Sequence, residues 1–401
     1  MANDKRTHIL VVSDPPVAPG YLPRLRYLCD YLDRKGYAVT LLTETSEPLP
    51  FAHNYPIETI RMYSGNTFDW FVKTVWTLLT DWHNRVFAKR ALSVLHGEFD
   101  LVFCTAFSDF PLGAAQRIAQ TLHVPLICDI RDLDEQVEDS KYQYQHKQWW
   151  LMPFRRLYRA VHIRRRNKVL RAANAITTVS PWHKDFIRNL TSNSVPVYTI
   201  YNGFDEQQFY PENIRTEQFT ITYIGSLFHW QRPALEKVKQ AVEEIRSQVS
   251  DVRFLISLRS NDYSQSEFSE FRIQMDIHTP QDHPVAHDRL GDAIRRSGIM
   301  LVLTSPNTHG MLTTKFYEAL GCAKPILCVP SDQGALAELM AYTNAGIATD
   351  DIEAIKAFIL QHYRSWEQNG FTAQQTQHRE EFSREAQTEQ MEQILLSTIN
   401  K

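Results

Sequence analysis

Short apolar segments rich in β-branched residues recur along the first half of the chain. They read "THILVVSD", "YAVTLLTE", "DLVFCT", "VPLICDI", "AITTVS" and "VYTIYNG". Most are separated by stretches whose apolar residues repeat at helical spacing, such as Leu22, Leu25, Leu28 and Leu32. Continuous apolar strands that alternate with helices are typical of a parallel sheet covered by helices on both faces. The pattern predicts one α/β domain over residues 1–201.

The same alternation starts again after residue 201. "FTITYIGS", "DVRFLIS", "IMLVLTS", "KPILCVPS" and "AGIATD" are strand-like, with helical segments between them. A second α/β domain is expected over residues 202–371, because a chain of 401 residues exceeds one ordinary hydrophobic core. Residues 372–401 follow a long helical pattern that could lie across either domain. Open α/β sheets bind ligands at the carboxyl ends of their strands, so the cleft between two such domains is the expected site.

Composition changes this picture little. Hydrophobic residues make up 43% and charged residues 22% of the chain, which are ordinary values for a globular protein. No signal-peptide pattern precedes the first strand, and no apolar run approaches the ~20 residues that span a bilayer, so a cytoplasmic protein is expected. The five cysteines are widely spaced in mostly apolar segments, and the fifteen histidines show no ligand-like spacing. No disulfide, metal site or cofactor is predicted.

A lysine and a glutamate lie near the start of the helix predicted in "TTKFYEALGCAK", which follows the strand "IMLVLTS" and a polar loop. Thr313 or Thr314 can cap this helix. Its free N–H groups and dipole attract phosphate, and Lys315 adds a positive charge. Glu318, one turn further on, could accept hydrogen bonds from sugar hydroxyls. The alternative is a capped helix with a solvated salt bridge.

A second candidate phosphate contact lies in "TYIGSLFHWQRP". Gly225 ends a predicted strand and allows a ligand to approach the backbone closely. Ser226 offers a hydroxyl group, and Arg232 lies just before a helix with Pro233 in its first turn. A single glycine after a strand is common, and the segment matches neither a dinucleotide fingerprint nor a P-loop.

Charged residues cluster at the end of a strand of the first domain, in "CDIRDLDEQ". The cluster contains Asp129, Arg131, Asp132 and Asp134. Carboxylates beside an arginine could orient or deprotonate a hydroxyl group. Equally, Asp129 could cap the loop while Arg131 and Asp132 form a structural pair.

Residues 140–184 contain eleven lysines or arginines and no acid, in a chain whose net charge is −3. Trp149 and Trp150 precede the most basic part. Basic charge beside tryptophan suits an anionic membrane surface or an anionic lipid-linked ligand. Nucleic acid is disfavoured by the pI near 6.6 and the absence of a nucleic-acid motif, and a solvated helix face is the remaining alternative.

Three further tryptophans recur at helical spacing upstream, at positions Trp70, Trp76 and Trp82. For these, core packing is the default and an exposed membrane-facing surface the alternative.

Several segments together resemble the retaining nucleotide-sugar glycosyltransferases of the GT-B fold, the bacterial family 4-like proteins also called glycosyl transferases group 1. The segments are "ITTVSPWHKDFI", "VYTIYNGFDEQQFYP", "TYIGSLFHWQRP" and "TTKFYEALGCAKPILCV", in the order and at about the spacing of the family. "FDLVFCTAF" followed by "VPLICDIRDL" resembles its first-domain core. The resemblance implies two Rossmann-like, doubly wound domains facing across a cleft. Residues 1–201 would bind the acceptor, residues 202–371 the donor, and the final helix, 372–401, would return to the first domain.

The resemblance also implies roles for single residues. Gly225, Ser226 and Arg232 would face the donor diphosphate, and Glu318 would bind the nucleotide ribose. The residues near the phosphates or the transferred sugar would be His309, Gly310, Thr313, Thr314 and Lys315. The acceptor loop would contain Pro15, Pro16 and Gly20.

Two positions depart from the family pattern. Family members often carry a glutamate eight residues before the position of Glu318. Gly310 stands there in this chain, and a shift of one residue would put His309 in its place. In the acceptor loop, Gly20 is followed by Tyr21 where a second glycine is common.

The expected activity is transfer of a sugar, with retention, from a nucleotide-diphosphate donor to a saccharide or lipid-linked saccharide in bacterial polysaccharide or glycolipid synthesis. Arg232, Lys315 and helix N-termini would stabilise the leaving diphosphate without a metal ion. Asp129, Arg131 and Asp132 would hold the acceptor hydroxyl, and no protein nucleophile is assigned. The protein would be cytoplasmic, at the inner face of the membrane. The alternatives are a nucleotide-sugar epimerase on the same fold and a non-catalytic binding partner in a polysaccharide complex.

Overall fold

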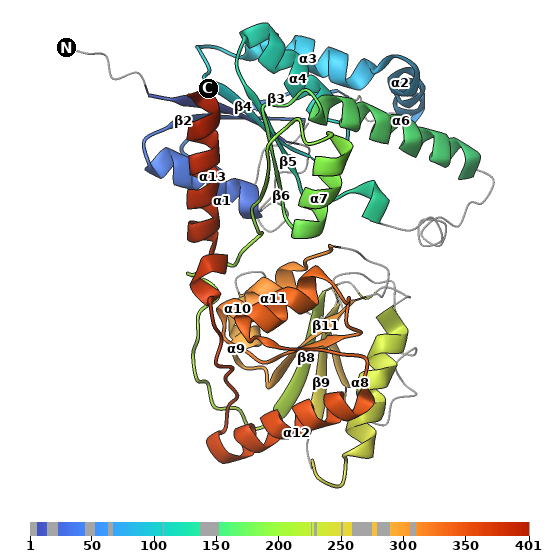
Figure 1. Cartoon of the computed structure of the whole chain (residues 1–401), viewed down its shortest axis with the longest axis vertical. Helices are drawn as coiled ribbons and strands as arrows, with labels where there is room; N and C mark the ends of the chain where they lie inside the picture. The colour runs from blue at the N-terminus through green and yellow to red at the C-terminus, as the bar shows by residue number, and fades with distance from the viewer. Residues whose placement is uncertain are drawn as a thin grey trace. The chain divides into compact units, whose positions relative to one another are not determined.

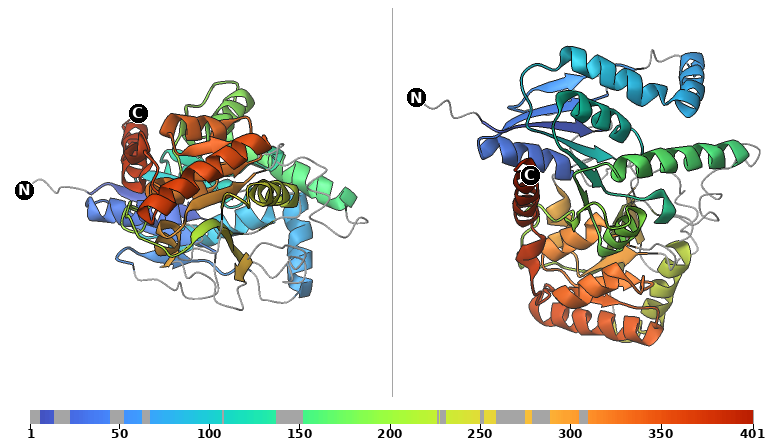
Figure 2. Two further views of the ribbon diagram at one scale, coloured as in Figure 1. Left: turned by 90° about the horizontal axis from the view of Figure 1, so that it is seen from below. Right: turned by 45° about the horizontal axis from the view of Figure 1, so that its top comes forward.

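Two compact units make up the chain. The computed structural model describes residues 6–13, 23–44, 53–62, 67–106, 108–136, 152–225, 227, 231–249, 252–258, 275–278, 289–304 and 310–400. Unit 1 comprises Met1–Tyr201 and Gln387–Lys401, and unit 2 comprises Asn202–Ala386. Each unit contains one parallel sheet flanked by helices (Figures 1 and 2).

The sheet of unit 1 has seven strands in the order β3-β2-β1-β4-β5-β6-β7. The strands are β1 (His8–Ser13), β2 (Ala38–Thr43), β3 (Ile57–Thr59), β4 (Leu101–Ala106), β5 (Leu126–Ile130), β6 (Ala175–Thr178) and β7 (Val197–Thr199). Neighbouring strands are parallel, and the strand order reverses between β1 and β4. This reversal is the point where open α/β sheets usually bind ligands.

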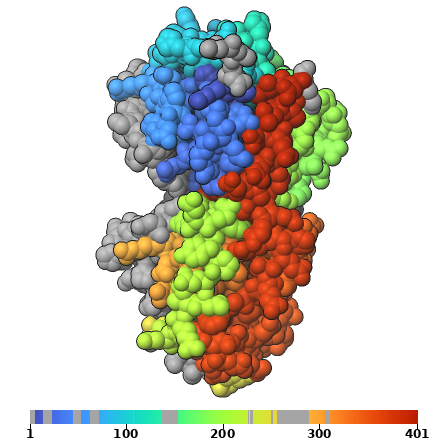
Figure 3. Space-filling view, turned by 90° about the vertical axis from the view of Figure 1, so that its left-hand side faces the viewer, coloured from blue at the N-terminus to red at the C-terminus, as the bar shows by residue number. Residues whose placement is uncertain are grey.

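Helices cover both faces of this sheet. They are α1 (Pro23–Arg34), α2 (Thr67–Thr80), α3 (Trp82–Val94), α4 (Leu112–Leu122), η1 (Asp134–Gln136), α6 (Met152–Leu170), α7 (Pro181–Leu190) and α13 (Arg384–Ile399). On one face, α3 and α4 bury apolar residues such as Phe87 and Ile118. On the other, α13 packs its Leu395 into a core that also holds Leu28 and Tyr31 of α1, and the two helices lie side by side (Figure 3).

The sheet of unit 2 has six strands in the order β10-β9-β8-β11-β12-β13, again all parallel. The strands are β8 (Phe219–Gly225), β9 (Val252–Leu258), β10 (Met275–His278), β11 (Ile299–Leu303), β12 (Ile326–Val329) and β13 (Gly346–Ala348). The strand order reverses between β8 and β11. The carboxyl ends of these two strands are therefore where a ligand of unit 2 is expected.

The helices of unit 2 are α8 (Arg232–Glu244), α9 (Leu290–Arg295), α10 (Thr314–Gly321), α11 (Ala335–Thr343), α12 (Ile352–Asn369) and η6 (Arg379–Phe382). The buried side chains of α8 and α12 share one core, which includes Val238 and Ile359. Local signals set the ends of α12, because the Asp351 side chain accepts a hydrogen bond from the N–H of Glu353 and Gly370 ends the helix with a φ of 78°.

These observations confirm the predicted fold class, with two doubly wound parallel sheets in sequence. None of the helices in the described part of the chain combines the length and the apolar character that crossing a bilayer requires.

Candidate functional site

A glycine and a lysine meet where the strand order of unit 2 reverses. β8 ends at Gly225, and the segment after β11 leads to Lys315 at the start of α10. A Cβ atom built on Gly225 would lie 2.3 Å from Cε and 2.7 Å from Nζ of Lys315. The lysine side chain therefore lies directly against the backbone at the end of β8. The Gly225 φ of 143° is also one that other residues rarely adopt.

The start of α10 is shaped by a side-chain cap. Thr313 has extended backbone angles, and its side chain accepts a hydrogen bond of 3.4 Å from the N–H of Lys315. Thr314 is the first helical residue and is exposed. Gly310 has a φ of 65°, the left-handed conformation, which lets the chain turn before the cap. Of the two predicted caps, Thr313 is the one that acts.

The start of α8 lies at the same edge of the sheet. Gln231, just before Arg232, donates from Nε2 to the carbonyl of Leu303 at the end of β11, at 2.7 Å. The Gln231 side chain, at the N-cap position, makes no capping hydrogen bond to α8. The start of α11, in contrast, is already satisfied, because the carboxylate of Asp332 accepts hydrogen bonds from two backbone N–H groups of its first turn. The starts of α8 and α10 thus each combine a nearby cationic side chain with helix N–H groups suited to an anion.

Glu318 is buried on α10, with 8% of its surface exposed. Within the described ranges, no hydrogen bond or ion pair engages its carboxylate. A carboxylate that is largely shielded from water keeps its capacity to accept hydrogen bonds. A ligand that donates hydrogen bonds, such as a diol, would satisfy it.

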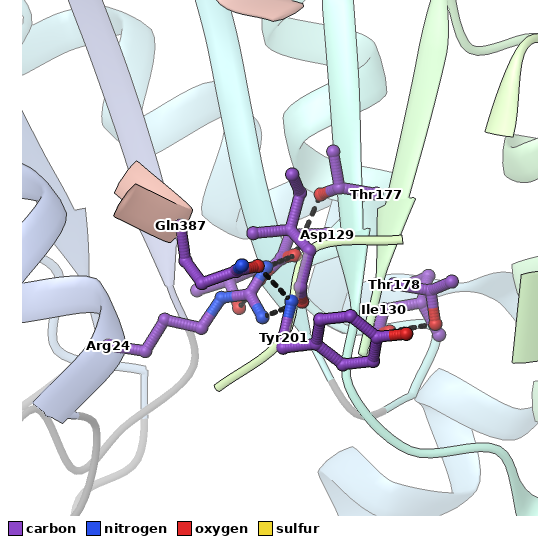
Figure 4. A network of polar contacts seen from close by, with 9 residues as sticks. Arg24, Asp129, Ile130, Thr177, Thr178, Tyr201 and Gln387 are labelled. Atoms are coloured by element: carbon purple, nitrogen blue, oxygen red, sulfur yellow. Dashed lines mark hydrogen bonds and ion pairs between the residues drawn. The ribbon is translucent and has the colours of Figure 1, made fainter. Parts of the chain in front are cut away.

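Asp129 lies in a row of polar residues set by the strand register of unit 1, opposite Thr105 on β4 and Thr177 on β6. Its Oδ1 accepts hydrogen bonds from Arg24 Nη2 at 2.9 Å and Thr177 Oγ1 at 2.7 Å (Figure 4). Its Oδ2 accepts one from Thr105 Oγ1 at 3.1 Å. Arg24 also donates to the carbonyl of Ile200 at 2.5 Å. Because both carboxylate oxygens are engaged, the geometry favours a structural role for Asp129 over that of a base.

Asp129→Asn should therefore lower stability more than activity. The amide can keep a hydrogen bond to Thr177 but loses the charge that faces Arg24, so we expect a loss of about 2 kcal/mol in the free energy of unfolding. Chemical denaturation would measure it, alongside turnover at a temperature where both proteins are folded. If the variant keeps its stability but loses most of its turnover, Asp129 acts in catalysis instead.

Arg131 and Asp132 follow directly at the end of β5. Arg131 is partly buried, whereas Asp132 exposes part of its surface. Protein nevertheless surrounds the Asp132 carboxyl closely enough for desolvation to raise its pKa, and the charge of Asp134 adds to this while Arg131 opposes it. An exposed carboxylate with a raised pKa is better suited to accept a proton than Asp129.

A buried cluster that sequence reasoning missed lies at the strand reversal of unit 1. Asp109 follows β4, is 1% exposed, and pairs with Nδ1 of His162 on α6. Among the residues that the structure describes, neither the second oxygen of Asp109 nor Nε2 of His162 has a hydrogen-bond partner. On the next turn of α6, Arg166 donates from Nη2 to Glu135 Oε1 at 2.5 Å. His162 and Arg166 are four residues apart in the sequence, which places them on one face of a helix and could have indicated this cluster. Counting the charges of the whole segment did not reveal that face.

Four predicted site residues or groups lie outside the described residues. They are the acceptor-loop positions Pro15, Pro16 and Gly20, together with Ser226, His309 and Trp149–Trp150. Among the residues that the structure does describe, no three His, Cys, Asp or Glu side chains gather in a way that could hold a metal ion.

Comparisons with known proteins agree with this architecture. Residues 24–208, a little under half of the chain, match the family model of Glycosyltransferase Family 4. No curated protein matches the sequence. Sucrose-phosphate synthase from Thermosynechococcus elongatus has a similar structure, with a TM-score of 0.62, 16% identity, and coverage of 98% of this chain and 99% of that one. The Anabaena protein HepE, in complex with UDP-glucose, aligns with a TM-score of 0.59, 13% identity, and coverage of 98% and 100%.

A putative UDP-N-acetylglucosamine 2-epimerase from Listeria monocytogenes is also similar, with a TM-score of 0.59, 12% identity, and coverage of 98% of this chain and 97% of that one. At such identities, the structural likeness establishes the fold. Residues 24–208 are therefore similar to Glycosyltransferase Family 4, and the chain as a whole has the GT-B fold of these structures.

Proposed function

We propose that the protein is a glycosyltransferase that moves a sugar, with retention, from a nucleotide-diphosphate donor to a saccharide or lipid-linked saccharide acceptor. The observation that carries this proposal is the lysine amine of Lys315 held against Gly225 at the β8–β11 reversal. The family match of residues 24–208 and the UDP-glucose complex of the similar Anabaena protein support it.

The donor diphosphate would lie at the starts of α8 and α10. As the bond between the anomeric carbon and the diphosphate oxygen breaks, negative charge grows on the departing diphosphate. Lys315, Arg232 and the helix N–H groups would stabilise this charge, the kind of contribution that is often the largest in catalysis. We propose that these groups act in place of a metal ion. The buried carboxylate of Glu318 would accept hydrogen bonds from the ribose hydroxyls.

The acceptor would be held by unit 1, with Asp132 and Arg131 near the reacting hydroxyl and Asp129 positioning the strands that support them. Its oxygen would bond to the anomeric carbon on the face that the diphosphate leaves, without a protein nucleophile, and its proton would pass to the departing diphosphate. Bacterial polysaccharide or glycolipid synthesis at the inner face of the membrane would supply such an acceptor.

A nucleotide-sugar epimerase is the second candidate, favoured by the similarity to the Listeria protein at the same TM-score as HepE. An epimerase needs a donor and no acceptor. Conversion of a nucleotide sugar to its epimer in the absence of any acceptor would therefore decide for this candidate. Binding without turnover of any kind would instead favour a non-catalytic partner.

A thermal-shift panel of UDP, GDP, ADP and their sugars, with and without EDTA, tests the donor site. A ligand at 100 times its Kd stabilises the folded state by ~2.7 kcal/mol. We expect one diphosphate to raise the Tm, equally with EDTA, and Glu318→Ala to abolish the shift. Glu338→Ala, on the exposed surface of neighbouring α11, is the matched control and should keep the shift. If no nucleotide shifts the Tm, the assignment of the donor site is wrong.

A further inference from the structure

We propose that α2 and α6 of unit 1 form a surface that docks on an anionic lipid membrane. The α2–α6 surface comprises the exposed residues Trp76, Leu79, Phe154, Arg156, Leu157, Arg164 and Lys168. Both helices project from the same side of unit 1 in the views of Figures 1 and 2. This inference goes beyond sugar transfer and does not depend on it.

Exposed large apolar side chains concentrate on these two helices. Across the described ranges, seven such residues are strongly exposed, and four of them are in α2 and α6. On α2, Trp76 is 53% and Leu79 is 72% exposed; on α6, Phe154 is 41% and Leu157 is 55% exposed. A single exposed apolar residue is ordinary, but a cluster rimmed by polar residues marks an interaction surface.

Arg165 joins the two helices. Its guanidinium donates to the carbonyl of Thr77 at 2.7 Å and to that of Leu78 at 2.8 Å. These carbonyls belong to the last turn of α2. That of Thr77 also accepts a hydrogen bond from the N–H of Asp81, and Arg165 adds a C-terminal cap to this turn. Trp76 and Leu79, on the same turn, are thereby tied to α6.

The arginines of α6 differ in their environment according to the side of the helix on which they lie. Arg166 is buried against Glu135, and Arg159 donates to the carbonyl of Asp134. On the opposite side, Arg156 and Arg164 are exposed beside Leu157. The outward side of the helix therefore alternates basic and apolar residues, a pattern typical of helices that lie in a membrane interface.

The positive charge of α6 favours an anionic partner for this surface. Residues 140–184 include no acid, so the exposed part of α6 presents only positive charge. A second copy of the chain would bring the same positive surface to the contact and would be repelled. Anionic phospholipid headgroups attract such a surface, and the acyl region accommodates Trp76, Leu79 and Leu157.

Sedimentation of the full chain with vesicles tests the proposal. We expect binding to phosphatidylcholine vesicles that contain phosphatidylglycerol, little binding to phosphatidylcholine alone, and weaker binding at high salt. Arg156→Gln with Arg164→Gln should weaken binding about five-fold per arginine. The control pair, Arg246→Gln with Arg296→Gln, removes two exposed arginines from unit 2 and should bind normally.

A second readout follows the apolar contacts. Brominated acyl chains should quench part of the tryptophan fluorescence of the wild type, and less of it in Trp76→Phe. Leu79→Ser with Leu157→Ser changes exposed residues, so it should leave the melting temperature unchanged while reducing vesicle binding.

Undiminished binding by both double variants, or no binding to phosphatidylglycerol vesicles at low salt, would overturn the proposal. A dimer in solution that Leu79→Ser with Leu157→Ser dissociates would assign the surface to a second copy instead. Neither readout needs donor turnover, so failure here leaves the proposed transferase standing.

Discussion

Lys315→Ala is expected to lower kcat by about 10²–10³-fold, the usual effect of removing one group that stabilises developing charge. Donor affinity should fall much less, because the lysine charge matters most when the diphosphate departs. The expectation rests on the contact of Lys315 with Gly225 at the end of β8. Release of the nucleoside diphosphate from each candidate donor, followed over a range of concentrations, gives kcat and KM separately.

Gly225→Ala should have a similar effect without changing the lysine itself. Its new Cβ would lie 2.3 Å from Lys315 Cε, so the amine would have to move. Lys237→Ala, on α8 of the same unit, is the matched control because it removes a partly exposed lysine, and it should retain full turnover. Wild-type kcat in both Lys315→Ala and Gly225→Ala would remove this pair from the mechanism.

Acid should destabilise both units in parallel. Burial lowers the pKa of His183 in unit 1 and of His362 in unit 2 from 6.5 to about 4. As the pH falls from 6.5 toward 4, these two histidines therefore become protonated in the unfolded chain while they stay neutral in the folded chain. Stability is complete above the unfolded pKa and is lost through this window, by roughly 3 kcal/mol for each histidine.

Chemical denaturation at neutral pH and near the lower pKa would measure this loss. The two histidines together make the free energy of unfolding fall as the pH falls. His183→Gln and His362→Gln should each remove about half of that fall. The exposed His96 offers a control, since His96→Gln should keep the wild-type slope. Acid sensitivity that persists in the double variant would place its origin in other groups.

The fold class was predictable because each buried strand is a continuous apolar segment, as in "IMLVLTS" and "VPLICDI". The role of Asp129 was not. Its position near the carboxyl end of a strand suits a base and a structural anchor equally well. Only the parallel register, which sets Thr105 and Thr177 beside it and brings Arg24 from α1, distinguishes the two.

The basic segment shows a second limit of linear patterns. Counting eleven positive charges over residues 140–184 suggests one uniformly basic surface. The helical phase of α6 instead turns Arg166 inward, to an acid that lies about thirty residues earlier, and leaves Arg164 outside. Such a pairing depends on which loop faces the helix, and a segment of sequence does not contain that information.

The place of α13 in unit 1 has a consequence for synthesis. Its residues Met391, Ile394 and Leu395 belong to the core beneath α1, and Glu392 accepts hydrogen bonds from Tyr31 and Tyr37. Residues 1–201 therefore leave the ribosome without the helix that completes their core, because nearly all of unit 2 is made before that helix. Domains usually fold in the order in which they are made. In this chain, the unit that begins first can be completed only after residues 387–401 have been made, and its apolar flank must be protected until then.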